Sequence, residues 1–242
     1  MCPNMMKPFA DFKEDLRLFC SENAINNNKI SVVGVSKKKS LEDILELYKL
    51  GLRDFGENYA QELNEKSLAL NSEKIRWHFI GPIQTNKIGL IVKNSYLIHS
   101  VDREKVVKKI DLESKKINKI QKVLVHVNIS GEASKSGIFP GDAEEFMHFV
   151  DSFNNLELAG LMFMPNINQD KVSHIREIKD SVALFKDMKS KRRNIQVLSL
   201  GTSSDYKECI KAGSNLIRVG EILFGPRPVS YTHLTLPTIY SV

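Results

Sequence analysis

Short apolar runs alternate with amphipathic stretches along almost the whole chain. Runs rich in β-branched residues predict strands at 30–35, 52–55, 75–80, 96–99, 123–129, 156–162, 195–198 and 215–219. Apolar residues spaced three and four positions apart predict helices at 8–21, 41–50, 57–70, 102–118, 141–153, 172–190 and 203–212, with a further helical segment after Pro82. Ser40 and Asp102 stand where N-caps of two of these helices are expected. The pattern amounts to about eight strand–helix units that follow one extra N-terminal helix.

Strands that alternate with helices predict an α/β fold with right-handed crossovers and a parallel sheet. Eight units favour a closed (β/α)₈ TIM barrel, for which about 250 residues is the typical length. A doubly wound open sheet is the alternative, and periodicity alone does not separate the two. No stretch rich in Pro, Gly or Ser divides the chain, so we expect a single domain.

Composition narrows the class of protein. The chain has 242 residues, of which 42% are apolar and 26% charged, so it can bury a core and is neither disordered nor fibrous. Its net charge of +6 favours anionic ligands, phosphate esters as readily as nucleic acid. Three widely spaced cysteines argue against a disulfide scaffold or a zinc site and suit a reducing compartment. With no apolar run long enough for a membrane helix and no signal peptide, we expect a cytoplasmic protein.

Lys37 is a candidate nucleophile at the end of the first strand. It shares the parity of Val33 and Val35, so its side chain should point toward the mouth of a barrel, where active sites of this fold lie. A lysine that is partly desolvated there can form a Schiff base. Alternatively, Lys37 belongs to a solvated basic loop with its two neighbouring lysines, which the pattern alone favours.

Two glycine-containing loops predict a phosphate site. Residues 198–205 (LSLGTSSD) and 217–225 (IRVGEILFG) each lead from a strand through a glycine to a helix start. Free N–H groups at such positions bind phosphate, and barrel enzymes often place a phosphate between the loops after strands 7 and 8. The alternative is that Gly201 and Gly220 only form tight turns and that Ser203 is only an N-cap.

Other polar residues near strand ends are less specific. Arg218 ends a buried strand and must find a partner there. Glu57 and Asn58 lie in FGENY, where both can also cap the following helix. His78 is best explained as a hydrogen-bonded structural histidine, and Met162 as core. The histidines show no metal-ligand spacing, so no metal site is expected.

Several segments together resemble one known family. VSKKK, GLRDFGENYAQE, WHFIGPIQTNK, HSVDR, VNISGEASKSGI, GLMFMP and LSLGTSSD…AGSNLIRVGEILFG are similar to the YggS/PROSC family of pyridoxal 5′-phosphate (PLP) homeostasis proteins. They occur in the order and spacing of that family from about residue 30 to residue 225. The resemblance implies the barrel of the alanine racemase N-terminal domain.

The resemblance also implies roles for individual residues. Lys37 would form the Schiff base with PLP, and Ser203 with backbone N–H groups around Gly220 and Glu221 would hold the phosphate. Arg218 would lie beside the pyridine nitrogen, where it disfavours protonation and makes the ring a weaker electron sink. The remaining implied pocket residues are Asn58 and Met162.

The chain departs from the family pattern in three places. Thr202 stands where many relatives have methionine, and Glu221 stands where a small hydroxyl residue is common, so its carboxylate would repel phosphate unless it points away. Residues 229–242 (VSYTHLTLPTIYSV) carry no Lys, Arg, Asp or Glu and are unlike the family. This tail resembles translated adapter or vector sequence, so we expect the PLP-binding barrel to be residues 1–228 and the tail to be non-native and disordered.

The resemblance favours a PLP-binding carrier that stores, buffers or delivers the cofactor as a reversible lysine aldimine, without robust catalysis. Its expected partners are PLP and PLP-dependent apo-enzymes, with the protein itself a monomer or weak dimer. The alternative is a PLP-dependent amino-acid racemase, but racemases take one base from a second domain, for which the length leaves no room. A third possibility, RNA binding, rests on the charge and on residues 191–193 (KRR) alone, so no specific nucleic acid is expected.

Overall fold

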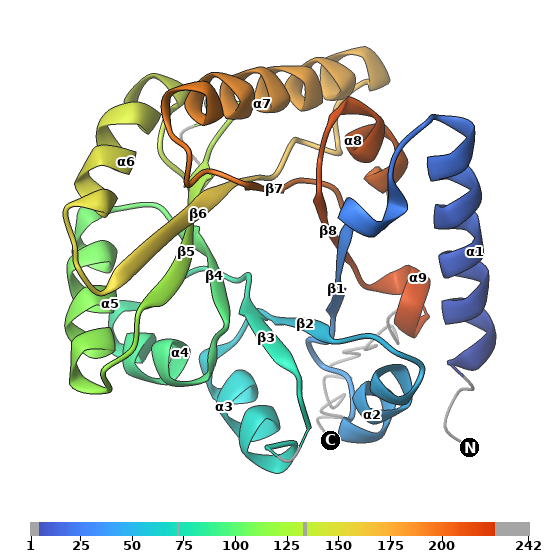
Figure 1. Ribbon diagram of the computed structural model, residues 1–242, viewed down its shortest axis with the longest axis horizontal. Helices are drawn as coiled ribbons and strands as arrows, with labels where there is room; N and C mark the ends of the chain where they lie inside the picture. Colours follow the sequence, from blue (N-terminus) through green and yellow to red (C-terminus); the bar gives the residue numbers. More distant parts are fainter. Residues whose placement is uncertain (1–4, 72, 133–134, 226–242) are drawn as a thin grey trace, which may run out of the picture.

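Eight parallel strands form a closed barrel in the computed structural model, which describes residues 5–71, 73–132 and 135–225 (Figure 1). Each strand pairs with the next in chain order, and β8 pairs with β1. The strands are β1 (Ser31–Val35), β2 (Asp54–Glu57), β3 (Arg76–Phe79), β4 (Leu97–Val101), β5 (Gln121–Val127), β6 (Leu156–Phe163), β7 (Val197–Ser199) and β8 (Leu216–Val219). The predicted (β/α)₈ barrel is confirmed, and an open sheet is excluded.

A ring of helices surrounds the barrel (Figure 1). The α-helices are α1 (Met6–Glu22), α2 (Leu41–Lys49), α3 (Ala60–Ala69), α4 (Ile88–Asn94), α5 (Glu104–Lys116), α6 (Ala143–Asp151), α7 (Lys171–Lys191), α8 (Tyr206–Ala212) and α9 (Glu221–Phe224). Three short 3₁₀ turns, η1 (Asn27–Lys29), η2 (Thr85–Lys87) and η3 (Pro140–Asp142), precede β1, α4 and α6. Ser40 caps α2 as predicted, since its hydroxyl accepts a hydrogen bond from the amide of Asp43.

The extra helix α1 completes the ring beside the last strand. The helix after β8, α9, has four residues, and α1 packs alongside it (Figure 1). The apolar face of α1, which includes Phe9 and Phe12, is buried. Asp15 of α1 accepts hydrogen bonds from Tyr206 and Lys207 of α8, the latter at 2.6 Å. The N-terminal helix therefore supplies the cover that the short α9 does not.

The barrel interior is partly apolar and partly polar. Its apolar cluster contains Val33, Leu97, Leu124, Ala159, Met162 and Leu216. Buried polar residues lie two positions along a strand from members of this cluster or pair with it across strands, and therefore face inward as well. They are Asp54, His78, His99, His126, Ser199 and Arg218.

Three predicted boundaries are wrong. Strand β2 begins at Asp54 and includes Glu57, so α3 starts at Ala60 and neither Glu57 nor Asn58 caps it. Buried hydrogen bonds to Ser36 and Lys66 hold Glu57 in the sheet, a long-range effect that local periodicity does not show.

The other two corrections concern helix starts. Asp102 does not cap α5, because the helix starts at Glu104 and the Asp102 carboxylate accepts a hydrogen bond from Arg103 at 2.6 Å. Helix α8 starts at Tyr206, with Asp205 in the N-cap position, so Ser203 is not an N-cap. The predicted tail at 229–242 lies outside the described residues. Among the residues that are described, no helix combines the length and apolar character needed to span a bilayer.

Candidate functional site

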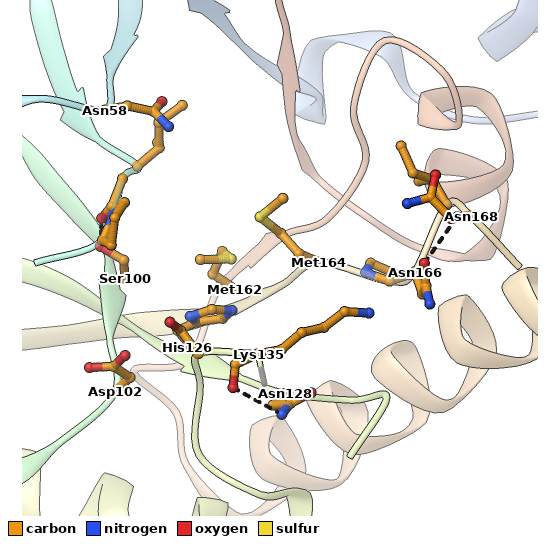
Figure 2. A pocket seen from close by; sticks show the side chains of 16 residues that line it. Asn58, Ser100, Asp102, His126, Asn128, Lys135, Met162, Met164, Asn166 and Asn168 are labelled. Atoms are coloured by element: carbon orange, nitrogen blue, oxygen red, sulfur yellow. Dashed lines mark hydrogen bonds between the residues drawn. The ribbon is translucent and has the colours of Figure 1, made fainter. Parts of the chain in front are cut away.

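A cavity of about 450 Å³ opens at the carboxyl ends of the strands. It is lined by residues at or after the ends of β2 to β6, including Asn58, Ser100, His126, Met162 and Asn166 (Figure 2). This is the end of the barrel where active sites of the fold are built. The lining is mixed and includes methionine and proline side chains as well as amide, hydroxyl and carboxyl groups.

Lys37 lies in the turn directly after β1 and is half-buried. Its neighbours are engaged elsewhere: the amide of Lys38 donates to Glu62 Oε1 at 2.5 Å, and Lys39 Nζ donates to the carbonyl of Phe224 at 3.1 Å. Lys37 and Lys39 are both half-buried, and Lys38 is exposed. Lys37 is the first member of the run and keeps the parity of Val33 and Val35 on the inner face of β1.

The two predicted phosphate loops meet at the mouth. The Oγ atom of Ser203 accepts a hydrogen bond from the backbone N–H of Gly220 at 3.0 Å. Gly201 has a φ of +111°, which favours glycine. Gly220 has a φ of −122°, so its value lies in close approach rather than in a positive φ. An added Cβ there would be 3.4 Å from the Cβ of Val35, next to the end of β1.

Thr202 has a hydrogen-bond partner in its own loop, and Glu221 is exposed. The Thr202 hydroxyl donates to Asp205 Oδ1 at 2.9 Å, and the Thr202 amide donates to the same oxygen at 2.7 Å. The Glu221 side chain is exposed at the first residue of α9. Thr202 therefore keeps the turn, and the Glu221 carboxylate is solvated rather than enclosed beside the loops.

Arg218 is a buried cation whose hydrogen-bond partners are neutral. Its Nη1 donates to Ser199 Oγ, and its Nη2 donates to the carbonyl of Phe163 at 3.0 Å. Burial lowers the pKa of Arg218 to about 10. Burial, and after it the charge of Arg218, lowers the pKa of His126 to about 4. Arg218 thus places a positive charge among neutral hydrogen-bond partners below the mouth.

Asn58 and Met162 line the cavity from opposite sides (Figure 2). The Oδ1 atom of Asn58 is buried and has no hydrogen-bond partner among the described residues. Its backbone lies against Gly81, where an added Cβ would be 2.1 Å from the Asn58 carbonyl oxygen. Met162 is 2% exposed and pairs in the sheet with Ser199, the hydroxyl partner of Arg218.

The structure brings the predicted residues together in two groups. Ser203 and Gly220 are in direct contact, with Arg218 in the strand that leads to them and Val35 linking them to the strand before Lys37. Asn58 and Met162 belong to the cavity. Three buried polar residues were missed by the sequence analysis: Asp54, His99 and Ser199. The signal for them was slight, a polar residue on the inner face of a predicted strand.

Within the described ranges, no group of three or more His, Cys, Asp or Glu side chains could hold a metal ion. His78, predicted to be structural, has both ring nitrogens in hydrogen bonds.

Comparison with known proteins identifies the family of this chain. The alanine racemase N-terminal domain family matches residues 24–228. A pyridoxal phosphate homeostasis protein of Vibrio alginolyticus is 37% identical over 205 residues, which cover 83% of this chain and 88% of the relative.

Solved structures agree with this placement. PipY of Synechococcus elongatus, solved without PLP, is 25% identical with a TM-score of 0.78, and the match covers 87% of this chain and 99% of PipY. An alanine racemase of Clostridium difficile shares the fold at 17% identity and a TM-score of 0.70, over 90% of this chain and 58% of the racemase chain. The chain belongs to the alanine racemase N-terminal domain family and, within it, to the pyridoxal phosphate homeostasis proteins.

Proposed function

We propose that this protein binds PLP at the mouth of the barrel and acts in PLP homeostasis by holding and releasing the cofactor. The observation that carries the proposal is the contact between the Ser203 hydroxyl and the Gly220 N–H at 3.0 Å. Both groups are donors that can bind a phosphate. PipY, which is similar in fold, has also been solved with PLP bound. The curated relatives are pyridoxal phosphate homeostasis proteins.

The residues present suit PLP in three respects. The buried, unpartnered Oδ1 of Asn58 is an acceptor that a ligand group can satisfy. Arg218 is a buried donor without a carboxylate partner in the described part of the chain, so it can donate to a ring nitrogen. Lys37 follows the inner face of β1 and is half-buried, which favours its amine as the group that attaches the cofactor.

We assign each residue a task that its contacts support. Ser203 and the backbone N–H groups of Gly220 and Glu221 bind the phosphate, and Met162 and Asn58 bound the pocket. Arg218 keeps the ring nitrogen unprotonated, because a guanidinium has no acceptor and an adjacent positive charge disfavours a second one. Bound PLP supplies an electrophilic carbonyl and an electron-accepting ring.

A ring held without a proton on its nitrogen is a poor electron sink, which favours a carrier over an enzyme. We therefore infer reversible attachment without robust catalysis, with PLP-dependent apo-enzymes as recipients and the protein as a monomer or weak dimer. Cytoplasmic residence stays a prediction from the cysteine pattern.

The test is an absorbance titration of the purified protein with PLP, followed by borohydride reduction and peptide mapping. We expect a reducible cofactor band in the wild type that maps to Lys37 and is lost in Lys37→Ala. Lys39→Ala is the matched control from the same turn and should keep the band. An identical reducible band in Lys37→Ala would overturn the assignment.

The absence of catalysis needs a separate measurement. We expect no exchange of the α-proton of alanine or serine in deuterated water with the PLP-loaded protein. Rapid exchange with interconversion of the D and L forms would show that the protein is a racemase rather than a carrier.

A further inference from the structure

A continuous chain of buried side chains runs through the barrel from its floor to Arg218. The Arg218 guanidinium donates to Ser199 Oγ, which is 2.9 Å from His99 Nδ1. His99 Nε2 is 2.8 Å from His78 Nδ1. His78 Nε2 is 2.9 Å from Oδ1 of Asp54, which lies at the opposite end of the barrel from the mouth.

The two ends of this series of hydrogen bonds have fixed roles, because Arg218 can only donate and an ionised Asp54 can only accept. A guanidinium has donors only, so the Ser199 oxygen accepts from Arg218 and its own proton must go elsewhere. In the described part of the protein, the other group within reach is His99 Nδ1, so the serine proton has an acceptor when Nδ1 is the unprotonated nitrogen.

The same reasoning applies to the proton positions on the two histidines. A neutral His99 carries its proton on Nε2 and donates it to His78 Nδ1. His78 then carries its proton on Nε2 and donates it to the carboxylate of Asp54. With both histidines neutral and Asp54 ionised, this is the direction in which every hydrogen bond has one donor and one acceptor.

The groups around these hydrogen bonds favour the uncharged form of His99. Burial, with the charge of Arg218 in addition, holds the pKa of His99 well below its ordinary value. Burial alone would raise the pKa of Asp54, but hydrogen bonds from Arg76 and His78 hold it below its usual value, so Asp54 is an ionised acceptor. Arg76 of β3 binds Asp54 with two nitrogens, at 2.7 and 2.5 Å.

We propose that Asp54, His78, His99 and Ser199 are positioning residues that form a one-way hydrogen-bond relay and hold Arg218 in place from the floor of the barrel. The relay occupies Nη1, and the carbonyl of Phe163 occupies Nη2, so the guanidinium cannot turn without breaking these two hydrogen bonds. The consequence for the cofactor rests on the proposed function: the relay keeps Arg218 a fixed donor toward the ring nitrogen.

The first test uses the protein without cofactor. In histidine labelled with ¹⁵N, long-range ¹H–¹⁵N spectra report which ring nitrogen carries the proton. We expect His78 and His99 to be neutral at pH 6 to 8 with the proton on Nε2. A proton on Nδ1 of either ring, or a charged ring at pH 7, would overturn the relay.

The second test breaks the relay at Ser199. Ser199→Ala should leave His99 as a mixture of tautomers and weaken PLP binding about tenfold or more, because a buried hydrogen bond to a charged group is lost. Ser199→Thr keeps the hydroxyl and should restore both. Ser181→Ala is the matched control, since Ser181 is equally buried but bonds the carbonyl of Glu177 on its own helix.

A third variant changes the relay at the floor of the barrel. Asp54→Asn removes the ionised acceptor from the floor, so His78 should lose its single tautomer and PLP should bind several-fold more weakly. Unchanged tautomers and PLP affinity in both Ser199→Ala and Asp54→Asn would refute the positioning role. If the wild type shows the expected tautomers but binds no PLP, the proposed function fails while the relay stands.

Discussion

The buried carboxyl group of Glu57 should make the stability of the protein fall as the pH rises from acid to neutral. Glu57 is fully buried at the end of β2, and its Oε1 contacts Ser36 Oγ at 2.6 Å and Lys66 Nζ at 2.9 Å. Burial raises the pKa of Glu57 to about 7, since desolvation outweighs the charge of Lys66 and the hydrogen bonds from Lys66 and Ser36. This carboxyl group also joins the strand ends that carry Lys37 and Asn58.

The sign and size follow from proton linkage. Between the unfolded pKa of 4.5 and the folded pKa of about 7, the folded state holds a proton that the unfolded state has lost, so stability falls as pH rises. At about 1.4 kcal/mol per pH unit, the free energy of unfolding should drop by about 3 kcal/mol over this range and then level off.

Glu57→Gln removes the titration while keeping an oxygen for Ser36 and Lys66. Its amide nitrogen replaces Oε2, which has no hydrogen-bond partner among the described residues. Urea unfolding at pH 5, 6, 7 and 8 should show a steep fall in the wild type that is absent from the variant. Glu62→Gln is the matched control: Glu62 also binds Lys66, at 2.7 Å, but is partly exposed, so the fall should remain. Parallel wild-type and Glu57→Gln profiles would refute the reasoning.

Three further changes give distinct results. Ser203→Ala should weaken PLP binding about tenfold in an absorbance titration, through loss of one hydrogen bond; an equal loss for pyridoxal, which lacks the phosphate, would contradict a phosphate contact. Gly81→Ala should lower the free energy of unfolding in urea by about 1–3 kcal/mol, because the new Cβ would be 2.1 Å from a backbone oxygen; Gly141→Ala meets nothing within 4 Å and should change it little. Tyr206→Phe should cost about 1 kcal/mol in thermal unfolding by removing the hydrogen bond to Asp15, and an unchanged Tm would show that this contact does not hold α1.

The architecture was predictable because each strand and helix carries its own local pattern. Alternation of apolar runs with amphipathic stretches predicted all eight strands, and Ser40 was recognised as a cap from its immediate neighbours. The errors arose where a hydrogen-bond partner far away in the sequence determines the local structure. Glu57 looked like a helix cap, but its partner Ser36 is 21 residues away and holds it in a strand.

The site was predictable in the same uneven way. The meeting of Ser203 and Gly220 followed from the usual place of phosphate loops in a barrel. The roles that we propose for Lys37 and Arg218 come from the family resemblance. His99 and Ser199 are 100 residues apart, and no spacing rule joins them. Their contact depends on the register of β4 and β7 around the closed barrel, which exists only once all eight strands are paired.

The position of α1 sets an order for the appearance of its contacts during synthesis. Asp15 binds Tyr206 and Lys207, which follow it by 191 and 192 residues. At about 5–20 residues per second, a ribosome takes roughly 10–40 s to add that length of chain. Throughout this interval the apolar face with Phe9, Phe12 and Leu16 has been made, but its cover on α8 and α9 has not. The apolar face of α1 therefore stays without this part of its cover until α8 and α9 have been made, and during that interval it is a surface that a chaperone can bind.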